Sequence, residues 1–166
     1  SIPARLFAFT WQILCVGRRA DAIFVSDYGL PATLAGKILG KPIVLKNVGD
    51  FAWEFSTRHG WLQTGVSIDR FQVKHHALRV RCLQRMRSWY AKAASVVIVP
   101  SRYVGGLVSG WGVLEDRIRV IHNALDISQF AVLPDRYIAR TQLGLPSEAS
   151  LMLTVARLTP WKGVAG

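Results

Sequence analysis

The stretch ASVVIVPSRYVGGLVSGWGVLEDRIRVIHNALDISQF, residues 94–130, decides the fold of this chain. It opens with the β-branched run Val96–Val99, which is typical of a strand buried on both faces. Ser101 follows, and its hydroxyl can cap a helix that we expect to end near Gly110. Residues 117–122 then make a second short strand. A strand, a helix and a strand in so few residues indicate a parallel βαβ unit.

The chain before this unit alternates in the same way. We expect a buried helix over residues 5–16 and, before the next helix begins, a short strand over 22–25. A small-residue helix over 30–39 ends at Gly40, and a strand follows over 43–46. The connections are short, as in α/β proteins. The predicted fold class is therefore α/β, with a Rossmann-like parallel sheet and flanking helices.

The middle and the end of the chain complete the expected elements. Residues 51–67 are aromatic and irregular, and 68–94 follow helical spacing with one apolar and one basic face. A short helix over 136–143 and a last strand over 150–155 follow. On the long helix, the expected apolar face holds Phe71, Leu78, Cys82, Met86, Trp89 and Ala93, and the basic face holds Arg70, Lys74, Arg79, Arg81, Arg85, Arg87 and Lys92.

Composition bounds the functional classes. The 166 residues are 51% hydrophobic, which is enough for about one domain with a sizeable core, and the net charge is +11. That charge suits an anionic ligand, an anionic membrane surface or nucleic acid, or a merely solvated basic face. Cys15 and Cys82 are expected to be reduced core thiols. We find no signal peptide and no apolar run long enough to span a membrane, and both ends have the character of a fragment.

The order of the motifs resembles the retaining glycosyltransferases of family 4. Residues 21–25 and 41–44 resemble the family's pair of strands "DvI…kPvV", and 94–101 resemble its strand "aD.vi..S". Residues 112–130 resemble "Gv…ki.vIpNGvD…F", and 153–163 resemble "vGRl…KG". Each motif is weak alone, but the ordered set spans about 21–163.

The resemblance implies a GT-B fold, truncated at both ends. It implies an acceptor-side domain over residues 1–122, a hinge over 123–134 and the start of a nucleotide-sugar-binding domain over 135–166. The whole protein would transfer a hexosyl group from a nucleotide-sugar to a glycan or lipid-linked acceptor, as in the synthesis of polysaccharide, glycolipid or lipopolysaccharide. We expect no cofactor and no metal, a cytoplasmic location with peripheral contact at the inner face of the plasma membrane, and a fragment that is inactive alone.

Arg157 and Lys162 are the strongest site candidates. They lie five positions apart in the loop after the last expected strand. Two fixed cations there would stabilise the charge that builds on a departing diphosphate, and the resemblance implies that role. Without the resemblance, Arg157 and Lys162 could equally be two solvated cations in a surface loop.

Asp50 and Glu54 lie in and just after the loop 47–50. The resemblance implies that this loop, where the family often has a His, lies near the reacting sugar or the acceptor. Asp50, which could orient an acceptor or donor hydroxyl, is therefore a candidate catalytic residue, and Glu54 a candidate for the acceptor cleft. The alternative for Asp50 is an Asx turn or a helix cap. The other cleft candidates are Asp27, Tyr28, Ser101 and Asn123, which end neighbouring strands, where parallel sheets bind ligands; capping and turn formation are their alternatives.

The basic face of residues 70–92 carries a separate hypothesis. Arg79, Arg81 and Arg85 are candidates for peripheral contact with an anionic membrane. A solvated surface is the alternative, and a second functional class is a basic α/β module that binds an anionic membrane or nucleic acid. No nucleic-acid motif is present, so we expect no nucleic-acid partner. His75 and His76 lack a third ligand at suitable spacing, so no metal site is predicted.

Overall fold

The computed structural model describes residues 2–130 and 132–157. The chain divides into two compact units, Ser1–Asn123 and Ala124–Gly166. The division falls at the start of the segment 123–134, for which the sequence predicts a hinge. That role stays a prediction, and each unit is described by itself.

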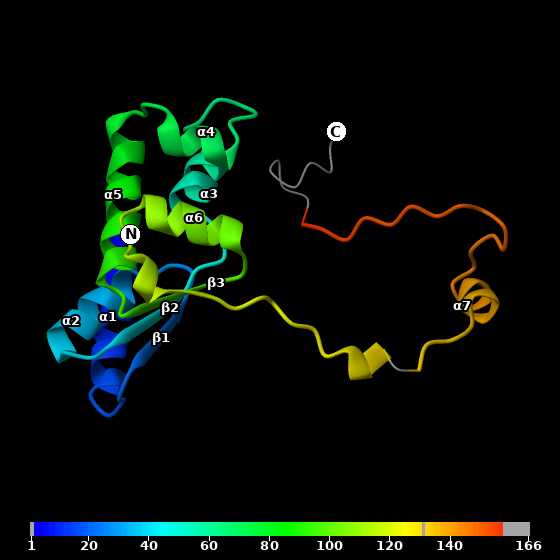
Figure 1. Cartoon of the computed structure of the whole chain (residues 1–166), viewed down its shortest axis with the longest axis horizontal. Helices are drawn as coiled ribbons and strands as arrows, with labels where there is room; N and C mark the ends of the chain where they lie inside the picture. The colour runs from blue at the N-terminus through cyan, green and yellow to red at the C-terminus, as the bar shows by residue number, and fades with distance from the viewer. Residues whose placement is uncertain (1, 131, 158–166) are drawn as a thin grey trace. The chain divides into compact units, whose positions relative to one another are not determined.

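The first unit is built on a parallel sheet (Figure 1). Its strands are β1 (Ile23–Ser26), β2 (Ile43–Lys46), β3 (Val96–Val99) and β4 (Ile118–Val120), and they lie in the order β1-β2-β3-β4. Ile23 pairs with Ile43, Leu45 with Val97, and Val97 with Ile118. The α/β fold class predicted from the sequence is confirmed.

The helices between the strands cover one face of this sheet. Helix α2 (Leu30–Leu39) joins β1 to β2, and α6 (Arg102–Gly110) with the short 3₁₀ turn Glu115–Arg117 joins β3 to β4. Between β2 and β3 lie α3 (Phe51–Arg58), α4 (Ile68–Val73) and α5 (Leu78–Ala93). Right-handed crossovers that all step in the same direction place their helices on the same face. The sheet residues of that face form the core, among them Val25, Leu45, Val97 and Val99.

The opposite face of the sheet is more open than the sequence predicts. The β-branched run of β3 was expected to be buried on both faces, yet its residues alternate between buried and half-buried. Phe24 of β1 is 64% exposed. The prediction of two equally covered faces is therefore wrong for this unit, because all of its crossover helices lie on the other side.

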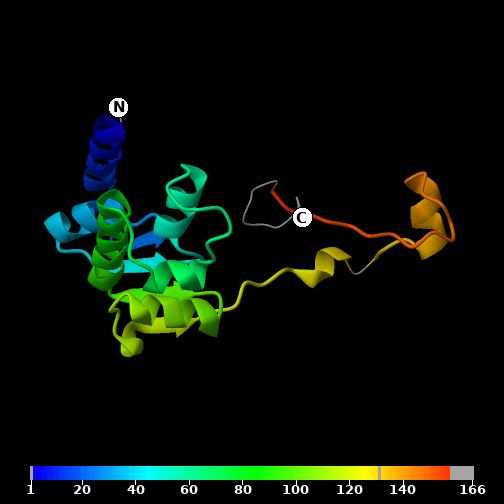
Figure 2. The ribbon, with the colours of Figure 1, turned by 90° about the horizontal axis from the view of Figure 1, so that it is seen from above.

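Helix α1 (Ile2–Gly17) forms where the sequence predicts a helix, but it is not buried. It packs on α2, while Phe7 is 73% and Trp11 56% exposed. Its N-terminal part extends beyond the neighbouring elements of the unit (Figure 2). The apolar sequence of α1 goes all the way round the helix, and one neighbouring helix can cover only one side of it.

The segment 51–67 is not irregular throughout. Asp50 caps a helix there, accepting hydrogen bonds from the amides of Ala52 and Trp53, so α3 begins at Phe51. The expected long helix over 68–94 is two helices, α4 and α5, separated by residues 74–77. Phe71 and Val80 explain the break. At about 100° per residue they would point to opposite sides of one continuous helix, whereas here both enter a second small core with Ala52.

The buried face of α5 also differs from the predicted one. Val80, Arg87, Tyr90 and Ala91 are buried, although Arg87 was assigned to the basic surface. Leu78 and Trp89 from the expected apolar face are exposed. Cys15 and Cys82 are free and exposed, so the prediction of core thiols is wrong. Spacing alone does not set the phase of a helix when its apolar residues spread round most of its circumference.

The second unit contains the 3₁₀ turn Ile127–Phe130 and the helix α7 (Arg136–Gln142). Asp135 caps α7 by accepting a hydrogen bond from the amide of Tyr137. The strand predicted over 150–155 is not formed, and residues 149–155 have no regular secondary structure. A strand requires a neighbouring strand to satisfy its backbone groups, and no such neighbour is present in the described part of the unit. Among the described residues, no helix is long and apolar enough to cross a membrane.

Candidate functional site

A small pocket lies at the carboxyl ends of β1 and β2, and we call it the cleft pocket. It is lined by Asp27, Asn47, Gly49, Phe51 and Glu54. Asp27 and Glu54 were both predicted as cleft residues, and the fold brings them together from the loop after β1 and from the first turn of α3. Asn47 was not predicted. Its position directly after a buried strand was the available signal, because that is where parallel sheets present polar groups.

Asp27 adopts an unusual backbone conformation at the end of β1. Its φ of 65° is the one positive value at a non-glycine residue among those described. Its amide donates to the carbonyl of Lys46 (2.8 Å) and its Oδ1 accepts from the amide of Val48 (3.3 Å). These bonds hold the carboxylate against the loop that follows β2. Left-handed backbone at a side-chain-bearing residue often marks a functional loop.

Asn47 and Gly49 shape the wall of the same pocket. Asn47 is buried, and its Nδ2 donates to the carbonyl of Gly49 (2.7 Å). A Cβ on residue 49 would lie 2.8 Å from Oε1 of Glu54. Glycine at this position therefore allows the Glu54 carboxylate to lie close to the loop backbone.

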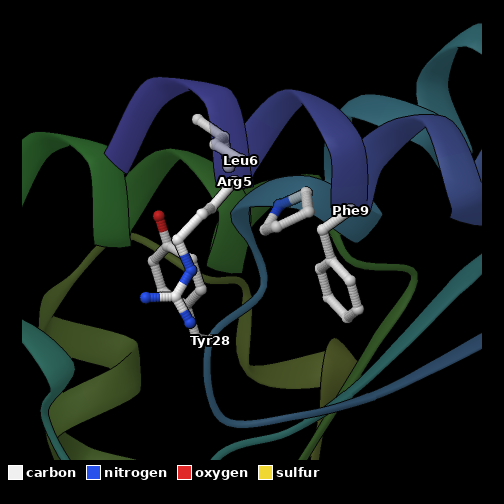
Figure 3. Close-up of a pocket in the computed structure, with 5 residues that line it drawn as sticks. Arg5, Leu6, Phe9 and Tyr28 are labelled. Atoms are coloured by element: carbon white, nitrogen blue, oxygen red, sulfur yellow. The ribbon is translucent and has the colours of Figure 1, made fainter. Parts of the chain in front are cut away.

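Tyr28 contributes mainly to a different pocket from Asp27. With Arg5, Leu6, Phe9 and Pro31 it lines a pocket beneath α1 (Figure 3). Its ring also lies 4.6 Å from that of Phe51, measured between centroids. Burial raises the pKa of the Tyr28 phenol. Tyr28 thus backs Phe51, which itself lines the cleft pocket.

Asp50, the candidate catalytic residue, has no exposed surface. Its Oδ1 accepts from the amides of Ala52 (2.9 Å) and Trp53 (3.2 Å), and its Oδ2 accepts from Nε2 of Gln72 (2.9 Å) and pairs with Arg87. These contacts match the helix-cap alternative. The catalytic role stays a prediction, and the geometry gives the carboxylate a structural task.

Arg87 is the residue that the sequence reasoning missed. It lies in α5, 37 positions after Asp50, and is only 4% exposed. Burial lowers its pKa, while the charge of Asp50 opposes that shift. Its guanidinium carbon lies 4.0 Å from the ring centroid of Trp111, whose Nε1 donates to Oε1 of Gln72 (3.1 Å). This buried network ties α3, α4, α5 and the end of α6 together.

Of the other predicted residues, Ser101 and Asn123 belong to the first unit and do not line the cleft pocket. Ser101 caps α6 by accepting from the amide of Val104 (3.3 Å), and Asn123 is exposed at the end of the first unit. Arg157 is exposed in the second unit, and Lys162 lies outside the described residues. The pairing of these two cations on a diphosphate therefore stays a prediction.

The three arginines predicted to face a membrane are all exposed, and one of them has an aromatic partner. The guanidinium carbon of Arg79 lies 4.7 Å from the ring centroid of Trp61. Arg81 and Arg85 lie on the exposed side of α5. Across residues 2–130 and 132–157, no group of three or more His, Cys, Asp or Glu side chains is placed to hold a metal ion.

Comparison with solved structures shows the fold. Structures of Anabaena Alr3699/HepE in complex with UDP and glucose and with UDP-glucose each match with a TM-score of 0.63 and 21% identity, covering 94% of this chain and 37% of theirs. A complex of the same protein with UDP matches with a TM-score of 0.53 and 19% identity, covering 81% of this chain and 32% of the other. The chain thus spans about a third of the length of that protein. No curated protein sequence gives a significant match.

The sequence itself carries the family assignment. The sequence model of Glycosyltransferase Family 4 matches residues 2–129, which include the whole sheet and the four residues predicted at its strand ends, Asp27, Tyr28, Ser101 and Asn123. The parallel order of β1 to β4 agrees with the GT-B fold of the matched structures. The chain belongs to glycosyltransferase family 4.

Proposed function

We propose that the protein to which this chain belongs transfers a hexosyl group, with retention of configuration, from a nucleotide-sugar to a glycan or lipid-linked acceptor. The family match over residues 2–129 carries the proposal. The HepE structures, which contain UDP and UDP-glucose, favour a uridine nucleotide as the donor. Synthesis of a cell-surface polysaccharide, glycolipid or lipopolysaccharide is the corresponding process, at the cytoplasmic side of the membrane.

The cleft pocket is proposed to bind the acceptor. Carboxylates accept hydrogen bonds from sugar hydroxyls, and Asp27 and Glu54 present two carboxylates beside the Asn47 amide in one pocket. Asp50 has no exposed surface with which to reach a substrate. We therefore assign the orientation of the acceptor hydroxyl to Asp27 and Glu54, and to Asp50 the positioning of the loop and of α3.

Arg157 and Lys162 are proposed to bind the donor diphosphate. Departure of a nucleoside diphosphate concentrates negative charge on its terminal phosphate, and fixed cations stabilise that charge in the transition state. Two cations at this position would perform the task that a metal ion performs in other transferases, so the proposal requires neither a metal nor another cofactor.

The test uses the complete open reading frame. Sugar nucleotides, beginning with UDP-glucose, are supplied with membrane lipid extract as the acceptor, and release of nucleoside diphosphate is measured. Arg157→Ala is expected to lower kcat/KM by about 100-fold, whereas Arg136→Ala, which removes another exposed cation of the second unit, should leave it unchanged. Glu54→Gln should raise KM for the acceptor more than for the donor. Failure to consume any sugar nucleotide would overturn the proposal.

A peripheral contact with anionic membrane is proposed for the same protein. Arg81 and Arg85 are exposed on α5, and Leu78 (70% exposed) and Trp89 (37%) lie on the same helix. Cations flanked by apolar side chains favour an anionic interface. The alternative of a separate basic binding module predicts the same contact but no sugar-nucleotide turnover, so the transferase assay separates the two.

Co-sedimentation with vesicles tests this contact. The variant Arg81→Glu/Arg85→Glu should lose binding to vesicles that contain phosphatidylglycerol, and neutral vesicles should bind neither protein. The matched control is Arg117→Glu/Arg119→Glu, which reverses two exposed charges near and in β4. Equal loss in both variants would indicate net charge alone and would contradict a defined surface.

A further inference from the structure

A second polar pocket lies between α5 and α6, and we call it the Arg87 pocket. None of its residues lines the cleft pocket. Its polar wall comes from α4 and α5, and its other wall from α6. The lining residues are Gln72, Gln84, Arg87, Ser88, Gly106, Leu107, Gly110 and Trp111.

The charged group in this wall is buried and only partly satisfied. The side chain of Arg87 is 5% exposed, and a guanidinium has five N–H donors. Nη1 pairs with Asp50, while Nε has no hydrogen-bond partner among the described residues. A buried polar group without a partner costs free energy, so the guanidinium retains capacity for a further acceptor.

The surroundings of Arg87 select an oxyanion rather than a cation. No carboxylate lines the pocket. Asp50, the partner of Arg87, is fully buried and is not among the lining residues. The Ser88 hydroxyl is a further donor. Arg81 and Lys92, which are three and four positions from the lining residues Gln84 and Ser88, extend the same side of α5 with exposed cations.

The α6 wall leaves room for a ligand. Gly106 and Gly110 are exposed and stand one helical turn apart, and a Cβ built on either would meet nothing within 4 Å. Larger side chains there would occupy the pocket. The two glycines alone would not define a site, but they line the same pocket as the buried Arg87.

We propose that the Arg87 pocket is a second binding site, which takes a phosphate-type oxyanion through the Arg87 guanidinium and the Ser88 hydroxyl. The site goes beyond the proposed transferase function. Arg87 and Gln72 both contact Oδ2 of Asp50, which caps α3 beside the cleft pocket. Occupancy of the Arg87 pocket therefore acts on the residues that hold the Asp50 loop.

Trp111 provides the readout. Its indole N–H donates to Gln72 and its ring lies against Arg87, so its proton resonance reports a change at either group. The 166-residue chain is titrated with inorganic phosphate, with sodium chloride replacing it at constant ionic strength in a parallel series. We expect a saturable shift of the Trp111 indole resonance with phosphate and none with chloride.

Filling the pocket tests the location. Gly106→Leu places a side chain in the open space and removes a helix-interior glycine, so folding is preserved. It should weaken phosphate binding by at least about tenfold. The matched control, Ser109→Leu, lies on the same helix outside the pocket and should bind as the unchanged chain does.

The source of the oxyanion is resolved in two arms. A saturable response to free phosphate indicates a soluble ligand, and a response to phosphatidylglycerol vesicles alone, lost in Gly106→Leu, indicates a lipid headgroup. Either outcome supports the site. Shifts that are equal in phosphate and chloride, shifts that persist in Gly106→Leu, or no response in either arm would overturn it, whatever the transferase assay shows.

Discussion

Arg87→Ala is the sharpest test of how the first unit is held together. The substitution leaves the buried Asp50 carboxylate with the amides of Ala52 and Trp53 and the side-chain amide of Gln72, but without its counter-charge. Removing one partner of a buried ion pair costs about 3–5 kcal/mol. Domains of this kind have about 5–15 kcal/mol of stability in all, so the loss is a large share of the total.

A double-mutant cycle isolates the pair from other effects of truncation. Asp50→Asn keeps an oxygen to cap α3, but its amide nitrogen or oxygen must replace a charge beside Arg87 and Gln72. The double variant Asp50→Asn/Arg87→Ala removes both charges, and it should be more stable than the sum of the two single losses predicts. Groups in direct contact within one network couple by about 0.5–3 kcal/mol, and we expect a value in the upper half of that range.

Urea unfolding followed by far-UV circular dichroism gives each free energy of unfolding. The control is Arg85→Ala, which removes an exposed arginine from the same helix and should change stability by no more than about 0.5 kcal/mol. An exposed ion pair contributes less than about 1 kcal/mol. If Arg87→Ala lowers the free energy of unfolding by no more than that, the Asp50–Arg87 pair does not stabilise the first unit in the way expected of a buried ion pair. Strict additivity in the cycle would refute the reasoning in the same way.

Four further predictions rest on separate features. Burial is the largest cause of a raised pKa at Tyr90, so the native state holds the phenol proton more tightly than the unfolded chain does. The resulting contribution to the free energy of unfolding is complete below the usual pKa of about 10 and is lost as the pH rises above it. The free energy of unfolding measured from pH 9 to about 11 should therefore fall less in Tyr90→Phe, and at pH 7 that variant should match or exceed the unchanged chain, because the Tyr90 hydroxyl is buried without a partner among the described residues. Gly36→Ala places a Cβ 2.8 Å from Cδ1 of Ile43 and should cost about 1–3 kcal/mol in urea unfolding; an unchanged midpoint would show that α2 can shift away from β2. Gly106→Ala meets no neighbour and should gain up to about 1 kcal/mol, and a loss would contradict the open space at that position. Ser101→Ala removes the cap of α6 and should cost about 1 kcal/mol, with Ser101→Asp restoring most of it, as thermal unfolding of both variants can check.

The strands and short helices of the first unit were predictable because their signals are local. The β-branched runs of β1 to β3 and the αL glycine after α2 specify where each element begins or ends. Ser101 was also correctly predicted as a cap. Capping and turn formation depend on a few neighbouring residues, so they can be read without knowledge of the fold.

The elements that were mispredicted depend on distant partners. Residues 68–94 follow helical spacing throughout, and only the shared burial of Phe71 and Val80 in one small core requires the break between α4 and α5. The strand expected over 150–155 has the composition of a strand, but strand formation depends on a neighbour to pair with. The exposed aromatic side chains of α1 likewise reflect which elements pack against it.

The candidate site also combines features that local sequence sets with features that depend on distant partners. By itself, the sequence determined the alternation of strands and helices, the family, and the positions of Asp27 directly after β1 and of Glu54 shortly after β2. Only the tertiary structure decided that Asp27, Asn47 and Glu54 share a pocket, that Asp50 is buried, and that Arg87 pairs with it across 37 positions of chain. Local pattern sets which residues are available at an edge or on a helix. Which of them meet, and which charge is buried, depends on packing between segments that are far apart in the sequence.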